Sequence, residues 1–257
     1  MNPHLVFNNN RIEYRWYGDS APERPVLVFL HEGLGSVAQW RDFPLELSRM
    51  TQCRSFAYSR IGYGNSSACA LPRKVNFMHV EAIRILPAVL ELAGIEKYIL
   101  IGHSDGGSIG IIHSGYHQPA EQFGLITMAA HVFCEDLTVD SIAGAKKLYE
   151  NTGLKEKLQK YHGKNTECAF RGWNDVWLNP VFMHFNIEKY LKKVHVPYLA
   201  LQGTDDQYGT RLQMEVINDQ CPVSKTEWIE GCGHAPHISE TALTLDLMAY
   251  HINDLMT

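Results

Sequence analysis

The chain has 257 residues, of which 45% are hydrophobic and 20% are charged, and its formal net charge is −5. This is an ordinary globular composition, long enough to bury one large core. The acidic balance, with basic runs no longer than pairs such as Lys192-Lys193, gives no electrostatic basis for binding nucleic acid. No apolar run approaches membrane-spanning length, and the N-terminus lacks a basic start and an apolar signal stretch, so we expect a cytoplasmic protein with no membrane partner.

The six cysteines are spread along the chain without a Cys-x-x-Cys pair. This spacing indicates neither a disulfide framework nor a zinc site. His113 and His117 lie four residues apart, but no acidic third ligand accompanies them, so they are interpreted as helix-surface or core residues. We therefore expect buried thiols and no metal.

The first half of the chain predicts an antiparallel hairpin followed by alternating strands and helices. The hairpin strands are expected at 5–7 and 12–17, around the turn Asn8-Asn9-Asn10. Continuous apolar runs such as 25–30 are typical of strands buried on both faces of a sheet. The later elements are predicted as a helix at 38–49, a strand at 55–58, a helix at 80–93 with a kink at Pro87, a strand at 98–101 with a helix after it, and a strand at 123–130.

The alternation stops between 134 and 195, where the sequence is charged, helical in pattern and then rich in aromatic residues. It resumes with strands at 196–203 and 225–230 and helices at 212–218 and 239–256. The pattern predicts an α/β fold with a doubly wound, mostly parallel, eight-stranded sheet, whose ligands bind at the carboxyl ends of the strands. The core is expected to comprise 1–133 and 196–257, with 134–195 inserted after the sixth strand as a helical lid.

One short segment, Gly102-His103-Ser104-Asp105-Gly106, connects a predicted buried strand directly to a helix. A sharp turn of this kind crowds the backbone, and glycines leave room for it. The Ser104 hydroxyl would then project from the sheet edge, and the amide of Asp105 would point from the helix N-terminus toward the group that the hydroxyl attacks.

A serine hydroxyl is a poor nucleophile until a base removes its proton. Two later strand ends offer partners: Gly203-Thr204-Asp205-Asp206, and the loop 231–237 that contains His234. Their order along the chain, Ser then Asp then His, is that of serine hydrolases with a strand-turn-helix nucleophile.

With these motifs the chain resembles the α/β-hydrolase-fold serine hydrolases that carry a lid. The resemblance rests on four stretches in register, His31-Glu32-Gly33-Leu34-Gly35-Ser36 with Trp40, residues 60–66, the Ser104 turn and the two later loops. It implies that Ser104 is the nucleophile, His234 the base and Asp206 the acid, with Asp205 as the alternative acid. It also implies an oxyanion hole formed by the backbone amides of Asp105 and of Leu34 or Gly33. Glu32 departs from the common His-Gly-x pattern, so the second donor stays open.

The substrate pocket is expected near Glu32 and His103 and among aromatic residues of the predicted lid. These aromatic residues either line an apolar acyl or alcohol pocket or form the lid's own core; they are Trp173, Trp177, Phe182 and Phe185. If the carboxylate of Glu32 or Asp105 faces the pocket, substrates with a negative charge beside the carbonyl should be disfavoured.

The resemblance implies a carboxylesterase-like serine hydrolase that cleaves an ester of a small or medium-sized molecule through an acyl-enzyme, without a cofactor. Thioester or C–C bond hydrolysis is the alternative enzymatic interpretation. A non-catalytic small-molecule receptor on the same fold is the alternative from another class. An apolar lid could also support a homodimer.

Overall fold

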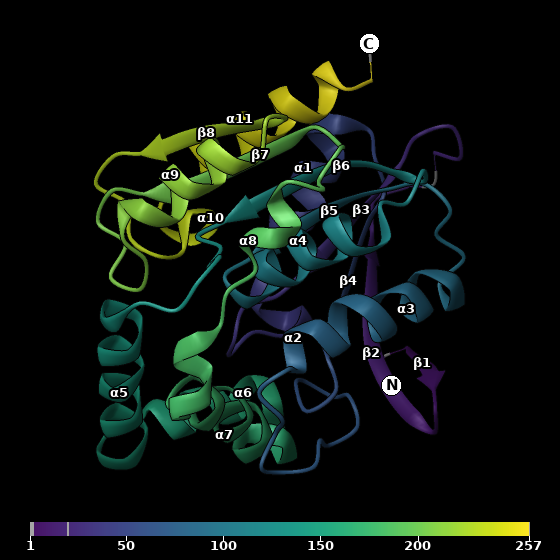
Figure 1. Ribbon diagram of the computed structural model, residues 1–257. Helices are drawn as coiled ribbons and strands as arrows, with labels where there is room; N and C mark the ends of the chain where they lie inside the picture. The colour runs from purple at the N-terminus through teal and green to yellow at the C-terminus, as the bar shows by residue number, and fades with distance from the viewer. Residues whose placement is uncertain (1–2, 20, 257) are drawn as a thin grey trace.

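The computed structural model describes residues 3–19 and 21–256, so the outermost residues of the predicted core, 1–2 and 257, lie outside it (Figure 1). Within this range eight strands form a single sheet in the order β1-β2-β4-β3-β5-β6-β7-β8. Strands β1 and β2 pair in antiparallel fashion, β2 is antiparallel to β4, and all other neighbours are parallel. The strands are β1 His4–Phe7, β2 Asn10–Tyr17, β3 Val26–Leu30, β4 Ser55–Tyr58, β5 Tyr98–His103, β6 Gln122–Met128, β7 Tyr198–Gly203 and β8 Ser224–Ile229.

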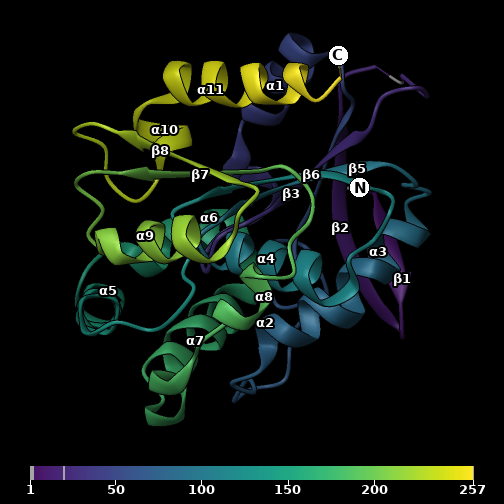
Figure 2. The same ribbon diagram turned by 45° about the horizontal axis from the view of Figure 1, so that its top comes forward.

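Helices cover both faces of this sheet (Figure 2). On one face lie two helices that pack on each other, α1 (Phe43–Thr51) and α11 (Thr241–Asp254). The helices on the other face are α2 Phe77–Val80, α3 Leu86–Leu92, α4 Asp105–His117, α8 Glu188–Leu191 and α9 Arg211–Gln220. The predicted doubly wound α/β architecture is therefore confirmed.

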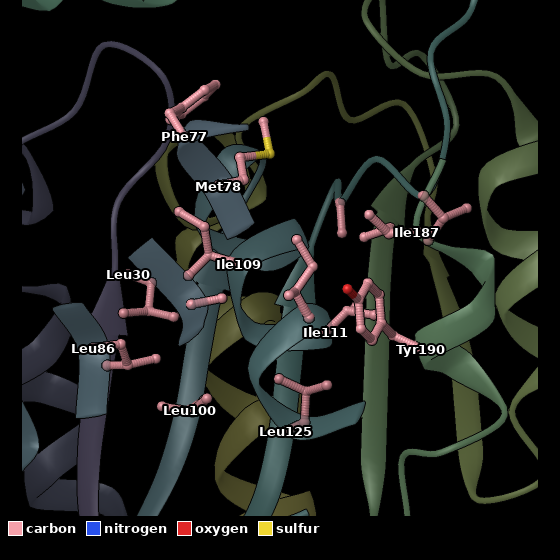
Figure 3. Close-up of a cluster of buried hydrophobic side chains, with 14 of the residues drawn as sticks. Leu30, Phe77, Met78, Leu86, Leu100, Ile109, Ile111, Leu125, Ile187 and Tyr190 are labelled. Atoms are coloured by element: carbon pink, nitrogen blue, oxygen red, sulfur yellow. The ribbon is translucent and has the colours of Figure 1, made fainter. Parts of the chain in front are cut away.

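The core beneath α4 joins the central strands to that helix (Figure 3). Leu100 and Leu125 project from β5 and β6, and Ile109 and Ile111 from α4 pack in the same cluster, all of them without solvent exposure. Burying a side chain of this size stabilises the fold by about 1.5–3 kcal/mol. This packing fixes α4 on β5, and the turn between them is where Ser104 lies.

The segment between β6 and β7 is helical, and we call residues 134–195 the insertion. Its main helices are α5 Asp136–Asn151, α6 Leu154–His162, α7 Thr166–Trp177 and the short α8, with 3-10 turns at Gly163–Asn165 and Pro180–His184. Figure 1 shows α5, α6 and α7 grouped below the sheet. Helix α8 packs closely on α4. A Cβ at Gly115 in α4 would lie 2.4 Å from the carbonyl oxygen of Tyr190 in α8.

Three predicted helices differ in detail from those observed. The helix expected at 38–49 is divided into a 3-10 turn, Val37–Trp40, and α1, which begins at Phe43. The helix expected at 80–93 begins earlier, at Phe77, and contains a π-helical turn, Glu81–Ile85, directly before Pro87. A wider turn there fits a residue that has no N–H for the helical ladder. The closing helix is divided into α10 (Pro236–Ser239) and α11.

No helix in the described residues is long and apolar enough to cross a bilayer.

Candidate active site

Ser104 lies in the sharp turn between β5 and α4, with φ of 52° and ψ of −118°. Few residues other than glycine adopt this conformation, and such strain is typical of functional turns. The two flanking glycines are required by close approach. A Cβ at Gly106 would lie 1.9 Å from the carbonyl oxygen of Leu30, and one at Gly102 would lie 2.4 Å from the carbonyl oxygen of Gly106.

Two further strand-end loops bring their side chains to Ser104. Ser104 Oγ lies 2.9 Å from His234 Nε2, and His234 Nδ1 lies 2.8 Å from Asp206 Oδ1. The Asp206 carboxylate also accepts the main-chain N–H of Tyr208 at 2.8 Å. The two loops touch at Gly203, where a Cβ would lie 2.0 Å from a carbonyl oxygen of the histidine loop. The structure thus assembles Ser104, His234 and Asp206, whereas the adjacent Asp205 is exposed.

The electrostatics suit a neutral base next to an ionised acid. Burial lowers the pKa of His234 from 6.5, and the Asp206 carboxylate partly opposes this by raising it. Burial raises the pKa of Asp206, but the hydrogen bond and charge of His234, the main-chain N–H of Tyr208 and the nearby His131 together outweigh this, so the net shift is downward. At neutral pH the imidazole can therefore accept a proton from the Ser104 hydroxyl while Asp206 remains charged.

His103 and Glu32 form a second layer beside His234. His103 Nε2 lies 2.8 Å from the carbonyl oxygen of His234, and His103 Nδ1 lies 3.7 Å from Glu32 Oε2. Burial raises the pKa of the Glu32 carboxyl, but His103, His31 and His237 together outweigh this and hold the pKa well below its usual range. The Glu32 side chain is 25% exposed and lines the cavity next to Ser104. Of the two carboxylates expected there, Glu32 is the one that faces the pocket.

The Asp105 side chain points away from the cavity and is fully buried. Its Oδ1 accepts the indole N–H of Trp177 at 3.1 Å, and its Oδ2 lies 4.0 Å from Arg60 Nη2. Burial raises the pKa of this carboxyl to about 6. Arg60 also donates to the carbonyl oxygens of His31 and Glu32, and so it connects the loop after β4 to the loop after β3.

The predicted oxyanion donors lie around the same serine. Asp105 is the first residue of α4, where main-chain amides have no acceptor within the helix. Gly33 and Leu34 line the cavity that contains Ser104. Gly33 packs against the indole of Trp173 and leaves no room for a side chain. A Cβ at this position would lie 2.1 Å from the ring.

A cavity of about 270 Å³ opens above Ser104. Its lining residues come from the oxyanion loop, the strand-end loops and the insertion, and they are Glu32, Gly33, Leu34, His103, Ser104, His131, Ile142, Trp173, Trp177, Gln207, Tyr208, His234 and Ala235. Trp173 and Trp177 thus lie where the pocket was expected. No lysine or arginine lines this cavity among the described residues.

Phe182 and Phe185 do not line the cavity, which corrects the expectation that they do. Their rings stack on each other at 4.8 Å, and Phe182 meets the edge of Trp177 at 4.7 Å. The 3-10 turn at 180–184 directs them into the core that the insertion shares with α2, where Phe182 stacks on Phe77 at 6.4 Å. They support the pocket wall without contacting the substrate space.

Sequence reasoning missed several lining residues, including His131 and Tyr208. His131 follows β6 and packs on Trp177 at 5.1 Å, and burial lowers its pKa to about 3, so it remains neutral. Tyr208 lies two residues after Asp206 and 4.7 Å from the His234 ring. Both follow the carboxyl ends of strands, which is the signal that could have indicated them.

This arrangement can perform acyl transfer, because a hydroxyl, a neutral imidazole, a carboxylate and a helix N-terminus converge at one point. Comparisons with known proteins agree with this chemistry. The sequence matches the "Alpha/beta hydrolase family" over residues 27–247. A proline iminopeptidase of Lactobacillus delbrueckii subsp. bulgaricus is 25% identical over an alignment 285 positions long, gaps included, which covers 96% of this chain and 95% of the relative.

Solved structures share the fold at low sequence identity. A structure from a study of carboxylesterases of the thaumarchaeon Nitrososphaera gargenis superposes with a TM-score of 0.82 at 17% identity, and 99% of each chain is covered. Proline iminopeptidase of Mycobacterium smegmatis superposes with a TM-score of 0.72 at 16% identity, covering 99% of this chain and 98% of the other. Fold, site geometry and the sequence match over most of the chain lead to one conclusion: this protein belongs to the α/β hydrolase family.

Proposed function

We propose that the chain is a serine hydrolase that cleaves a carboxylic ester of a small or medium-sized molecule through an acyl-enzyme. The observation that carries this proposal is the 2.9 Å contact between Ser104 Oγ and His234 Nε2, with Asp206 on the far ring nitrogen. The cavity of about 270 Å³ supports a compact substrate, because ligand pockets typically start at about 300 Å³.

In the proposed cycle His234 Nε2 takes the hydroxyl proton as Ser104 Oγ attacks the ester carbonyl. The negative oxygen of the tetrahedral intermediate accepts hydrogen bonds from the main-chain N–H groups of Asp105 and Leu34. Asp206 stabilises the imidazolium. The intermediate then expels the alkoxide, which leaves as the alcohol with the proton from His234. Water, deprotonated by His234, next attacks the acyl-enzyme, and the carboxylic acid is released as Ser104 regains its proton.

The insertion is proposed to act as the lid that selects the substrate. It contributes Ile142, Trp173 and Trp177 to the cavity wall. A wall of this kind favours apolar acyl or alcohol groups, because burying their surface contributes about 25 cal/mol per Å².

Hydrolysis of an amide next to a positively charged amine is a second candidate function. Two observations favour it: the Glu32 carboxylate faces a cavity whose described lining holds no lysine or arginine, and relatives along nearly the full chain are proline iminopeptidases. A carboxylate in a partly desolvated site attracts an ammonium group and repels a carboxylate. Anionic substrates are therefore disfavoured under both candidate functions.

Steady turnover of p-nitrophenyl butyrate that is abolished by Ser104→Ala would support the ester hydrolase. Turnover that persists in this variant would contradict Ser104 as the nucleophile. The absence of turnover in the wild-type protein, with ligand binding retained, would contradict the hydrolase and favour a receptor. L-Proline p-nitroanilide tests the amide candidate. A higher kcat/KM for this anilide than for p-nitrophenyl butyrate would favour amide hydrolysis, and a higher value for the butyrate would favour ester hydrolysis.

The charge preference is tested with p-nitrophenyl esters of butyrate, β-alanine and succinate. We expect the succinate monoester to be the poorest substrate and Glu32→Gln to improve it by about tenfold relative to butyrate. Glu46→Gln, which removes the same charge from an exposed helix position, serves as the matched control. If the wild-type protein prefers the succinate ester, the proposed repulsion of anionic substrates by Glu32 is contradicted.

A further inference from the structure

The last residue of α6, His162, is buried and uses both of its ring nitrogens. The main-chain N–H of Gly64 donates to His162 Nδ1 at 3.0 Å, and His162 Nε2 lies 2.9 Å from the carbonyl oxygen of Leu34. Because Nδ1 accepts a hydrogen bond, the proton must be on Nε2, which donates it to Leu34. The contact joins residues 128 apart in sequence and attaches the insertion to the predicted oxyanion loop.

The turn that follows His162 strengthens this attachment. Asn165 has no exposed surface, and its Nδ2 donates to the carbonyl oxygens of Gly64 at 3.1 Å and Ser66 at 2.7 Å. His162 thus accepts the main-chain N–H of Gly64, and Asn165 donates to the main-chain carbonyl oxygen of the same residue. The imidazole is therefore held in one orientation when it meets Leu34.

A second contact links the insertion to the other side of the predicted oxyanion hole. Trp177, in the last turn of α7, donates its indole N–H to Asp105 Oδ1 at 3.1 Å. Both side chains are buried, with exposures of 1% and 0%. Asp105 is the residue whose main-chain amide is expected to bind the oxyanion.

We infer that the insertion positions both donors of the oxyanion hole: His162 holds Leu34 through its carbonyl group, one peptide after the donor N–H, and Trp177 holds Asp105 through its carboxylate. Both are positioning residues, since His162 acts through the Leu34 carbonyl and Trp177 acts through the Asp105 carboxylate. The inference rests on the proposed acyl-transfer function and deepens it: the segment that encloses the substrate also sets the donors that stabilise the intermediate. Donors of this kind work only when they are held close to the position of the oxyanion.

If these contacts were only structural, removing them would lower the free energy of unfolding and leave the catalytic rate unchanged. The variants His162→Asn and His162→Gln separate the two cases. Asparagine places an amide oxygen near the position of Nδ1 and keeps the bond from Gly64, but it cannot reach Leu34. Glutamine places an amide nitrogen near the position of Nε2 and keeps the bond to Leu34.

The readouts are kcat and KM for p-nitrophenyl butyrate and the affinity for butylboronic acid, whose adduct with the serine is tetrahedral. We expect His162→Asn to lower kcat by about tenfold, with KM within about twofold of wild type, because the intermediate loses more stabilisation than the substrate. Boronate affinity should fall by the same factor. His162→Gln should recover most of both.

Trp177→Phe keeps an aromatic ring and removes the N–H to Asp105, so it should show the same loss in kcat and boronate affinity. His113→Asn is the matched control. His113 is also a buried imidazole with both nitrogens in hydrogen bonds, to Tyr98 Oη at 2.8 Å and to the carbonyl oxygen of Ala82 at 3.0 Å, but it lies away from the cavity. This control should lose stability while kcat and boronate affinity stay at the wild-type level.

The inference is overturned if folded His162→Asn keeps wild-type kcat and boronate affinity, or if its losses match those of His113→Asn. If His162→Asn does not fold, Trp177→Phe decides in the same way. Failure of the proposed function is distinguishable, because wild-type protein would then neither turn over the ester nor bind the boronate.

Discussion

Replacing Asp206 by asparagine tests the electrostatic core of the proposed mechanism. The carboxylate lies 2.8 Å from His234 Nδ1 and its side chain is 2% exposed. At this distance and an effective dielectric constant of about 20, it stabilises an imidazolium by about 6 kcal/mol, or about four orders of magnitude in rate. We therefore expect Asp206→Asn to lower kcat/KM for p-nitrophenyl butyrate by about 10³- to 10⁴-fold.

The same variant should also change the pH profile in a defined direction. The base must be neutral to accept the serine proton, so activity falls as the pH drops through the pKa of His234. That pKa lies below 6.5 because burial outweighs the Asp206 carboxylate, which raises it. Removing the carboxylate lowers the pKa further, and the acid limb of kcat/KM should move to lower pH while the plateau falls.

Asp205→Asn is the matched control, because Asp205 is the adjacent, exposed acid whose amide donates to the Cys232 carbonyl oxygen at 2.9 Å. It should keep kcat/KM within about twofold of wild type. The reasoning is refuted if Asp206→Asn retains activity within about tenfold of wild type, if Asp205→Asn is the more damaging change, or if the acid limb moves upward.

Two further predictions concern packing around the site. Gly106→Ala should destabilise the fold by about 3 kcal/mol or more in urea denaturation, because its Cβ would lie 1.9 Å from the Leu30 carbonyl oxygen. Gly144→Ala in α5, whose Cβ meets nothing within 4 Å, should instead stabilise by up to about 1 kcal/mol; equal effects would contradict the steric argument. Phe182→Ala should cost about 3–5 kcal/mol in unfolding free energy and leave the ranking of p-nitrophenyl esters by acyl length unchanged. Ile142→Ala, which enlarges the cavity, should shift the preference toward longer acyl chains, and a shift in both variants or in neither would contradict the division between pocket wall and insertion core.

Local sequence features determined the architecture of this chain. Apolar runs such as 25–30 and 98–101 specify strands buried on both faces, and their alternation with helical patterns leaves a parallel sheet as the way to bury them. The turn around Ser104 could also be predicted, because its two glycines meet a steric requirement within a few residues. The two loops that carry the partners of Ser104 followed from the rule that carboxyl ends of parallel strands meet at one edge, and the family resemblance implied His234 and Asp206 within them.

Tertiary structure decided which residues the insertion contacts. Whether Phe182 faces the substrate or Trp177 depends on how a 3-10 turn is oriented against α7, and no periodicity in the sequence records that orientation. The contacts of His162 with Leu34 and of Trp177 with Asp105 join residues 128 and 72 apart, so only the folded chain reveals them. Sequence patterns report which face of an element is buried, whereas the partner that each side chain meets is fixed by packing between distant segments.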